Sequence, residues 1–236
     1  MQLPYFFEEN PPNSGEFLLG EESSKHAVQV LRMLEYQDIH ITNGLGILLT
    51  CTILSAYKKR VRVCVKERVF SPRAGKSVSI AISNIKNSGR FEIFLEKATE
   101  LGITEIVPLI CGRTEKIYLK KERLHKILVS AMLQSRQNWM PELKEPIKFT
   151  ELIKEASADQ KFIAHCIDIV NKREIPMING SSQILIGPEG DFSENEINQA
   201  ESYGYQSVSL GETRLRTETA GIVAAVLLKN RVERSL

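Results

Sequence analysis

The sequence predicts an α/β protein with a small β-barrel first and a parallel sheet covered by helices after it. Short segments with alternating apolar and polar residues fill residues 1 to about 70, whereas strand-like and helix-like patterns alternate from residue 78 onward. A cluster of chain-breaking residues at 71–76 separates the two patterns. We therefore expect two domains, spanning residues 1–71 and 72–236.

The first part reads as antiparallel β-structure. Residues 39–42 lead into the turn-forming sequence Asn43-Gly44-Leu45-Gly46, which predicts a hairpin whose second strand covers 47–54. Residues 61–66 alternate apolar and mostly basic side chains, as a half-exposed strand does. A short helix is expected near residues 24–33. Several short strands within so few residues favour a small barrel.

The second part alternates strands and helices, which indicates a parallel sheet. One helix carries apolar residues at helical spacing and ends at Gly102, another starts with the capping pattern Ser193 to Glu196, and the last is apolar nearly all round. Strands are expected over residues 78–82, 106–110, 162–165, 184–186 and 206–210. Helices are expected over residues 90–101, 121–134, 194–203 and 218–229.

The composition is that of an ordinary globular protein, with 42% hydrophobic residues and a net charge of +2. A charge so close to zero does not by itself indicate a nucleic-acid partner. The four cysteines and four histidines are scattered without metal-ligand or disulfide spacing, so we expect reduced thiols, no metal and a cytoplasmic location. The N-terminus carries Glu8 and Glu9 and lacks a long apolar run, so neither a signal peptide nor a membrane span is expected.

Two glycine-bearing stretches near the C-terminus carry the functional signal. Ile186-Gly187-Pro188-Glu189-Gly190 follows a buried strand and precedes a helix start, and residues 210–220 follow the next strand. Loops that follow parallel strands meet at one edge of a sheet, so these two can form a pocket from backbone groups. The sequence lacks the glycine-rich fingerprints of dinucleotide and ATP sites and the serine elbow of esterases.

Together these stretches resemble the RsmE-type methyltransferases, which belong to the SPOUT superfamily of knotted enzymes. The matching residues are Ile186 to Gly190, Leu210-Gly211 and Leu215-Arg216-Thr217-Glu218-Thr219-Ala220, with further matches at His26, 30–32, 97–102, Gln134-Ser135 and Pro141. The resemblance implies an S-adenosylmethionine-dependent enzyme that methylates N3 of a uridine in small-subunit (16S) ribosomal RNA. It also implies a PUA-like RNA-binding barrel, a trefoil knot in the α/β part, and a homodimer that packs through knot helices.

The resemblance also assigns the cofactor site. The implied cofactor-binding residues are His165, Ile186, Gly187, Pro188, Glu189, Gly190, Leu210, Gly211, Leu215, Arg216 and Thr217. Each of them also has a structural interpretation, for instance an ordinary strand-to-helix turn at Gly187 or strand-end packing at His165. Asp191 departs from the family pattern, in which a glycine is more usual at this position.

Arg216 and Glu218 are the candidate catalytic residues. Loss of the proton from uracil N3 spreads negative charge over two carbonyl oxygens, which a guanidinium beside them would stabilise. Arg216 could instead pair with Glu218. Glu218 could accept the proton or could simply start the last helix.

Candidate RNA contacts are His26, Arg32, Arg60, Arg90 and Arg136, although charged residues are commonly just solvated surface. Gln137 stands where the family usually has an arginine, and Arg136 precedes it. Trp139 could stack a base or fill a dimer interface. Two alternative functions remain: a non-catalytic RNA-binding ribosome-assembly factor that keeps the fold, and methylation of transfer RNA by a related knotted enzyme.

Overall fold

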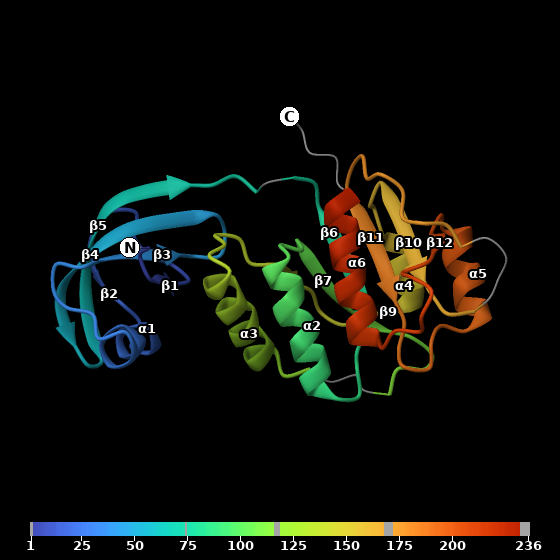
Figure 1. The fold of residues 1–236 in the computed structure, drawn as a ribbon, viewed down its shortest axis with the longest axis horizontal. Helices are drawn as coiled ribbons and strands as arrows, with labels where there is room; N and C mark the ends of the chain where they lie inside the picture. The colour runs from blue at the N-terminus through green and yellow to red at the C-terminus, as the bar shows by residue number, and fades with distance from the viewer. Residues whose placement is uncertain (1, 74, 116–118, 168–171, 232–236) are drawn as a thin grey trace. The chain divides into compact units, whose positions relative to one another are not determined.

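The computed structural model describes residues 2–73, 75–115, 119–167 and 172–231 (Figure 1). The chain forms two compact units: Met1–Arg73 with Val129–Met140, and Ala74–Leu128 with Pro141–Leu236. Each unit has its own β-sheet. The first unit therefore includes a segment that lies far along the chain from its strands.

The first unit is built around a five-stranded sheet with the order β1-β3-β4-β5-β2. Its strands are antiparallel except for the parallel pair β1–β3. The hairpin expected from the sequence is present, with longer strands, and the expected helix starts earlier and is split. The elements are β1 (Tyr5–Phe7), β2 (Gly15–Leu18), α1 (Glu21–Lys25), the π-helix η1 (His26–Val30), β3 (Asp38–Thr42), β4 (Ile47–Tyr57) and β5 (Arg60–Phe70).

The turn between β3 and β4 shows why its sequence contains two glycines. The Asn43 side chain accepts hydrogen bonds from the backbone N–H groups of Leu45 and Ile47, at 2.9 and 3.1 Å. Gly46 has φ +91°, and a Cβ atom there would lie 2.6 Å from the Trp139 ring. Only glycine meets both the backbone and the packing requirement at this position.

Residues 138–140 join the first unit through this turn. Gly46 N–H donates to Asn138 O at 2.8 Å, and Met140 N–H donates to Gly44 O at 2.9 Å. The indole of Trp139 donates to Ser71 O at 2.8 Å. Trp139 thus makes its contacts within the first unit, a role that neither sequence interpretation of this residue included.

The second unit contains a parallel sheet with the order β12-β10-β11-β6-β7-β8, and β9 also pairs with β7. The parallel sheet predicted from the alternating pattern is confirmed. Its strands are β6 (Val78–Ser83), β7 (Glu105–Ile110), β8 (Glu142–Leu143), β9 (Ile147–Lys148), β10 (Gln160–Ala164), β11 (Ser182–Ile186) and β12 (Gln206–Val208). The helices are α2 (Ser88–Glu100), α3 (Lys121–Gln134), α4 (Phe149–Glu155), α5 (Glu194–Ser202) and α6 (Thr217–Arg231), of which α3 runs across the division between the units.

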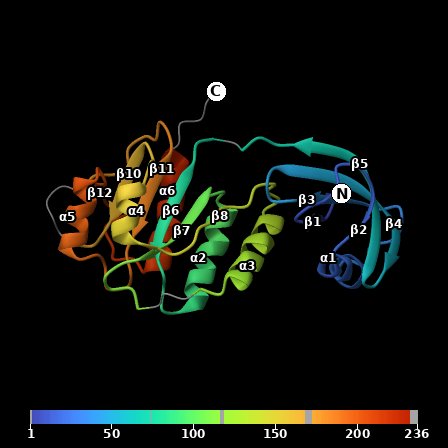
Figure 2. The ribbon, with the colours of Figure 1, turned by 180° about the vertical axis from the view of Figure 1, so that it is seen from behind.

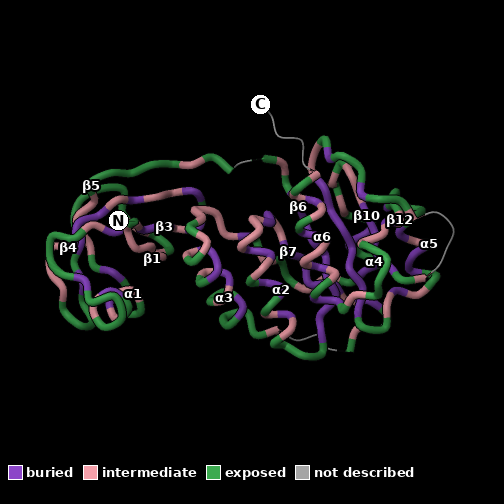
Figure 3. The backbone as a smooth tube through the Cα atoms, in the orientation of Figure 1, coloured by how far each residue is buried: buried purple, intermediate pink, exposed green. Residues whose placement is uncertain are grey.

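Helices cover both faces of the second unit's sheet (Figures 1 and 2). Helices α2 and α6 pack together on one face, where a Cβ atom on Gly221 would lie 2.7 Å from the Phe94 ring. Helices α4 and α5 contribute Phe149, Ile197 and other side chains to the apolar core on the opposite face. The central strands are buried along their length, as Figure 3 shows.

Helix α6 is less buried than its composition predicted. Gly221, Ala224, Ala225 and Leu228 are buried, whereas Val226 is 38% exposed. One face of the helix packs on α2 and the sheet, so its apolar surface exceeds what this unit covers. Among the described residues, no helix is both long and apolar enough to cross a membrane.

Candidate active site

A cavity of about 770 Å³ opens at the carboxyl edge of the second unit's parallel strands. Its volume is typical of pockets for small molecules and cofactors. The segments after β10, β11 and β12 surround it, so the structure brings the two glycine-bearing motifs together. The lining residues are Ala164, His165, Cys166, Lys172, Ile186, Gly187, Pro188, Glu189, Asp191, Val208, Ser209, Leu210, Gly211, Glu212, Thr213, Arg214, Leu215, Arg216, Thr217 and Ala220.

One wall, residues 186–193, packs tightly and is called the braced wall here. Gly187 is buried, and a Cβ atom at this position would lie 3.1 Å from the fully buried Phe192 ring. A methyl group here would force a small shift of Phe192, whose ring belongs to the core on which α4 and α5 pack. Pro188 is buried, and its carbonyl accepts a hydrogen bond from Asp191 N–H at 2.9 Å, which closes a tight turn.

Asp191 ties the braced wall to the end of β10. Its carboxylate accepts hydrogen bonds from Cys166 N–H at 2.7 Å and from Phe192 N–H at 2.8 Å. Its backbone is left-handed, with φ +63°. Glycine adopts this conformation without strain, and aspartate is one of the side chains that tolerate it. The geometry explains how aspartate can occupy this left-handed position.

Neighbouring loops hold the braced wall from outside the cavity. The Glu189 carboxylate accepts a hydrogen bond from Lys86 N–H at 3.2 Å, and Arg113 donates to Gly190 O at 2.6 Å. The capping box predicted at the start of α5 is confirmed, and Glu196 also accepts from Gly112 N–H at 2.9 Å. The loops after β6 and β7 therefore fix the position of the wall.

The opposite wall, residues 208–217, is called the open wall. Gly211 has φ +138°, and a Cβ atom there would meet no atom within 4 Å. Its side-chain bonding is local: Ser209 Oγ accepts from Gly211 N–H at 3.2 Å and lies 3.1 Å from Gly211 O. Residues 211–214 and Arg216 are exposed. Glycine is needed here for its backbone conformation and not for lack of space.

His165 closes the floor between the two walls. Its Nε2 lies 3.0 Å from Ser207 Oγ, which donates its single proton to the Glu201 carboxylate at 2.7 Å. The imidazole therefore donates from Nε2. Its Nδ1 is buried and has no hydrogen-bond partner in the described part of the chain. Burial lowers the pKa of His165 and Lys172 adds to this effect, whereas Asp191, Glu201 and the backbone of Ile167 oppose it.

The two candidate catalytic residues occupy different places. Arg216 is exposed and lines the cavity, and its carbonyl accepts from Ala220 N–H at 2.7 Å at the start of α6. Glu218 is buried and is not among the lining residues. Its Oε1 lies 3.6 Å from Nε of Arg90 in α2. Its Oε2 is buried without a hydrogen-bond partner among the described residues.

The structure gathers most of the sequence-predicted cofactor residues around the cavity. Gly190 is the exception, because it does not line the cavity and its carbonyl faces Arg113. The predicted RNA contacts are dispersed: Arg90 lies in the second unit, and the others lie in the first. His26, Arg32, Arg60 and Arg136 are all exposed.

Several lining residues had no separate role in the sequence analysis. Arg214 belongs to the second motif, and Ala220 follows Arg216 at a helical spacing of four residues, so the motif itself contained their signal. Lys172 follows a stretch without any recognisable motif. No local pattern could have placed it at the cavity.

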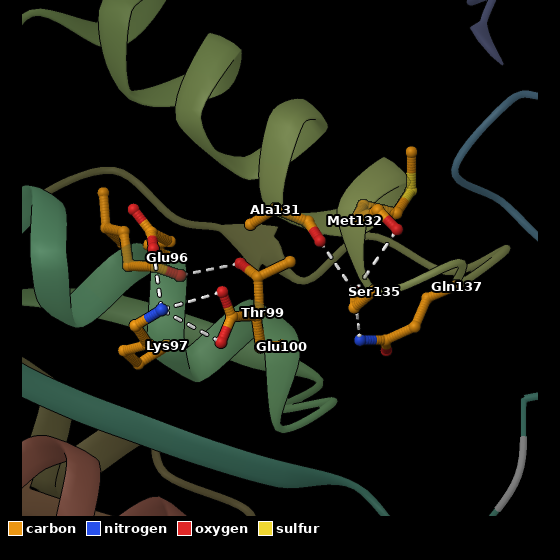
Figure 4. A network of polar contacts seen from close by, with 9 residues as sticks. Glu96, Lys97, Thr99, Glu100, Ala131, Met132, Ser135 and Gln137 are labelled. Carbon is orange, nitrogen blue, oxygen red and sulfur yellow. Dashed lines mark hydrogen bonds and ion pairs between the residues drawn. The ribbon is translucent and has the colours of Figure 1, made fainter. Parts of the chain in front are cut away.

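Two further stretches that carry the family resemblance make local bonds (Figure 4). In α2, Lys97 pairs with Glu96 and Glu100 at 2.7 and 2.9 Å. At the end of α3, Ser135 Oγ donates to Ala131 O at 2.7 Å, and the Gln137 amide donates to Ser135 Oγ at 2.9 Å. Gln137 thus folds back on the helix end, whereas Arg136 is exposed with a left-handed backbone, φ +55°.

Comparison with known proteins identifies the family. A family model described as RNA methyltransferase domain matches residues 72–229. Ribosomal RNA small subunit methyltransferase E of Aquifex aeolicus is 26% identical over 220 residues, which cover 92% of this chain and 95% of the relative.

Solved structures agree over nearly the whole chain. One is described as a probable rRNA-methyltransferase from Porphyromonas gingivalis, with 34% identity, a TM-score of 0.89, and coverage of 97% of this chain and 98% of that one. Another is Ribosomal RNA small subunit methyltransferase E from Neisseria gonorrhoeae bound to S-adenosyl methionine, with 27% identity, a TM-score of 0.86, and coverage of 97% and 98%. With its cavity formed by both motifs and its family match over residues 72–229, this chain belongs to the RNA methyltransferase domain family.

Proposed function

We propose that this protein transfers a methyl group from S-adenosylmethionine to N3 of a uridine in small-subunit ribosomal RNA. The observation that carries the proposal is the cavity that the two motifs line together. Relatives of the chain are named as small-subunit ribosomal RNA methyltransferases. The non-catalytic alternative is not favoured, because a factor without cofactor chemistry has no need for this cavity.

The cavity residues fit S-adenosylmethionine in size and chemistry. Apolar contacts for an adenine ring come from Ile186, Val208 and Leu215. Charges of both signs, among them Glu189 and Lys172, suit the ammonium and carboxylate groups of the amino-acid part. The buried Nδ1 of His165 and the exposed backbone at Gly211 offer further polar groups. When bound, the cofactor supplies an activated methyl group on a sulfonium.

In this proposal uracil N3 gives its proton to solvent water, and Arg216 stabilises the uracil as the negative charge develops. The guanidinium holds positive charge at the cavity, and uracil carries the developing negative charge on its two carbonyl oxygens. The remaining demand is alignment, which the braced wall provides by fixing one side of the cavity. Glu218 serves the site through Arg90, whose guanidinium it holds at the start of α2.

Candidate RNA contacts lie on each unit. His26, Arg32, Arg60 and Arg136 are exposed cations or rings on the first unit, and Arg90 is half-buried on the second. His26 lies against the Phe6 ring with centroids 5.9 Å apart, and Arg32 has a left-handed backbone with φ +53°. Strained residues of this kind concentrate at functional sites. The first unit is proposed to be the PUA-like RNA-binding domain.

A trefoil knot and a homodimer belong to the same proposal. The chain leaves the sheet at edge strand β12 and returns as α6 to pack beside the central strands β6 and β11, which supports a threaded C-terminal segment. The partly exposed Val226 on α6 supports packing against a second subunit. Residues 72–236 are proposed as the methyltransferase domain and residues 1–71 as the barrel, in a cytoplasmic, metal-independent enzyme.

The decisive experiment measures methyl transfer to small ribosomal subunits and to free 16S ribosomal RNA, both from cells lacking the modification. Tritium from labelled S-adenosylmethionine should enter one uridine, and mass mapping should place the methyl group on N3. Calorimetry should detect cofactor binding in the absence of RNA. Binding of RNA without any cofactor heat or methyl transfer would support the non-catalytic factor instead.

A further inference from the structure

A row of polar and aromatic side chains crosses the first unit's sheet on the face away from its apolar core. Tyr5 lies opposite His40, His40 opposite Thr50, and Thr50 opposite Glu67, so four strands contribute one residue each. The intervening residues, such as Phe6 and Ile39, point into the core. Tyr5 and His40 are half-buried, and their rings meet edge to face with centroids 5.0 Å apart.

Arg136 belongs to the turn after α3, and the residues that follow it bond the turn after β3: Gly46 N–H donates to Asn138 O at 2.8 Å, and Met140 N–H donates to Gly44 O at 2.9 Å. Burial raises the pKa of Tyr5, and the Arg136 guanidinium opposes this effect. Burial and Arg136 together lower the pKa of His40, and Glu67 opposes them. Arg136 is exposed, and none of the described residues forms an ion pair with it.

Internal hydrogen bonds leave polar groups of this arrangement unused. The Nδ1 atom of His40 is buried and has no partner among the described residues. The left-handed backbone of Arg136, φ +55°, closes the C-terminus of α3, where Arg136 N–H donates to Leu133 O at 3.1 Å and Gln137 N–H donates to Met132 O at 3.0 Å. Gln137 folds back on Ser135 at 2.9 Å, so Arg136 is the residue of this turn that faces solvent. Two half-exposed rings and an unpaired cation remain for a ligand.

We propose that Tyr5, His40 and Arg136 bind one unpaired nucleotide of the RNA substrate. The base stacks on the Tyr5–His40 ring pair, and Arg136 contacts a neighbouring phosphate. This inference rests on the proposed function. Aromatic rings and arginine are the groups with which proteins hold unstacked bases and their backbone. Glu67 at the far end of the row repels phosphate, so the sugar–phosphate backbone of the RNA runs on the Arg136 side.

Two measurements test the surface formed by Tyr5, His40 and Arg136. Steady-state methylation gives KM and kcat for small ribosomal subunits, and fluorescence anisotropy gives the affinity for a fluorescein-labelled single-stranded oligouridine over a range of salt concentrations. Tyr5→Ala should raise KM and weaken oligouridine binding roughly ten-fold, the loss expected for one stacked base, with kcat unchanged. Arg136→Gln should weaken binding similarly and also lower the salt dependence by about one released counterion.

Matched controls separate ring, charge and folding effects. Tyr5→Phe keeps the ring and should bind like the wild type. Tyr57→Ala removes a 72%-exposed ring outside the row and should change nothing. Far-ultraviolet circular dichroism and cofactor calorimetry should be the same for all variants, because the cavity belongs to the second unit.

The outcomes distinguish this inference from the proposed function. If the wild type transfers no methyl group, the proposed function fails, and the oligouridine measurements still decide the surface. If Tyr5→Ala and Arg136→Gln bind oligouridine within two-fold of the wild type, the surface does not hold RNA. A raised KM for subunits with unchanged oligouridine affinity would assign the row to a protein partner and would also overturn the inference.

Discussion

The two walls of the cavity are built in opposite ways. The braced wall is buried at Gly187 and Pro188, and hydrogen bonds from Lys86, Arg113 and Cys166 hold its backbone and side chains. The open wall is exposed over residues 211–214, and its side-chain bonds to described residues stay within Ser209 and Gly211. The difference indicates a fixed reference surface on one side and an adjustable surface, carrying Arg216, on the other.

Removal of the charge on the open wall should have the largest effect. Arg216→Ala should lower kcat about 100- to 1,000-fold, the loss typical of one electrostatic group that acts in the transition state. Arg216→Lys should recover part of the rate, and Arg214→Ala should cost less than ten-fold, because only Arg216 is proposed to face the uracil. Single-turnover methylation of small ribosomal subunits measures the methyl-transfer rate of each variant. A loss confined to cofactor affinity would contradict the catalytic role.

Removal of the Asp191 carboxylate from the braced wall should reduce both folding stability and cofactor affinity. Asp191→Ala loses both carboxylate hydrogen bonds and leaves alanine in a left-handed backbone, so unfolding should become easier by about 2 kcal/mol. Asp191→Gly keeps the backbone relaxed and should lose less. Urea unfolding and cofactor calorimetry measure both effects. Equal stability of the alanine and glycine variants would show that the left-handed conformation carries no strain.

The two glycines compare the walls directly. Gly187→Ala places a methyl group against Phe192 and should destabilise the fold by about 1–3 kcal/mol. Gly211→Ala meets no atom within 4 Å, so its cost comes from the backbone alone. The exposed loop should leave φ +138° to relieve the strain, which weakens cofactor binding while thermal stability falls by less than for Gly187→Ala. Calorimetric unfolding and cofactor titration distinguish the two variants. A fall in melting temperature as large as that of Gly187→Ala would mean that the open wall cannot relax and is held as firmly as the braced wall.

The smallest expected effect is the contribution of His165, on the floor between the walls, to the pH dependence of folding stability. Because burial lowers the pKa of His165 in the folded state, the unfolded chain binds its proton first as the pH falls below about 6.5. The contribution of His165 to the free energy of unfolding is therefore fully present above that pH and decreases as the pH falls. His165→Gln should remove the part of the acid sensitivity that comes from this group. Urea midpoints between pH 5 and 8 measure it, and identical slopes for both proteins would exclude the contribution.

The sequence predicted most of the second unit because its elements are long and strongly periodic. Helix α3 has the bounds expected from spacing, and α5 starts at the predicted capping box. The missed elements are short: β1 has three residues and α4 has seven, too few for a clear period. The cavity position could be predicted because both motifs follow parallel strands. Lys172 could not be predicted as a cavity residue, because its place depends on tertiary packing.

Two features of the site needed atomic geometry. The left-handed backbone of Asp191 is compatible with its residue type, yet its bond to Cys166 joins residues 25 positions apart. The separation of Arg216 from Glu218 follows from helix geometry, which turns neighbouring residues to different sides once α6 is packed. Neither contact leaves a signal in the local sequence.

The late segment Val129–Met140 has a consequence for how the chain matures on the ribosome. The first unit cannot complete its own structure when residue 73 has been synthesised, because Trp139 and its neighbours are still missing. Closing a loop this long costs entropy and delays folding. During synthesis from the N-terminus, the strands of the first unit therefore emerge more than fifty residues before the segment that completes their packing. A fragment ending at Arg73 should be prone to aggregation.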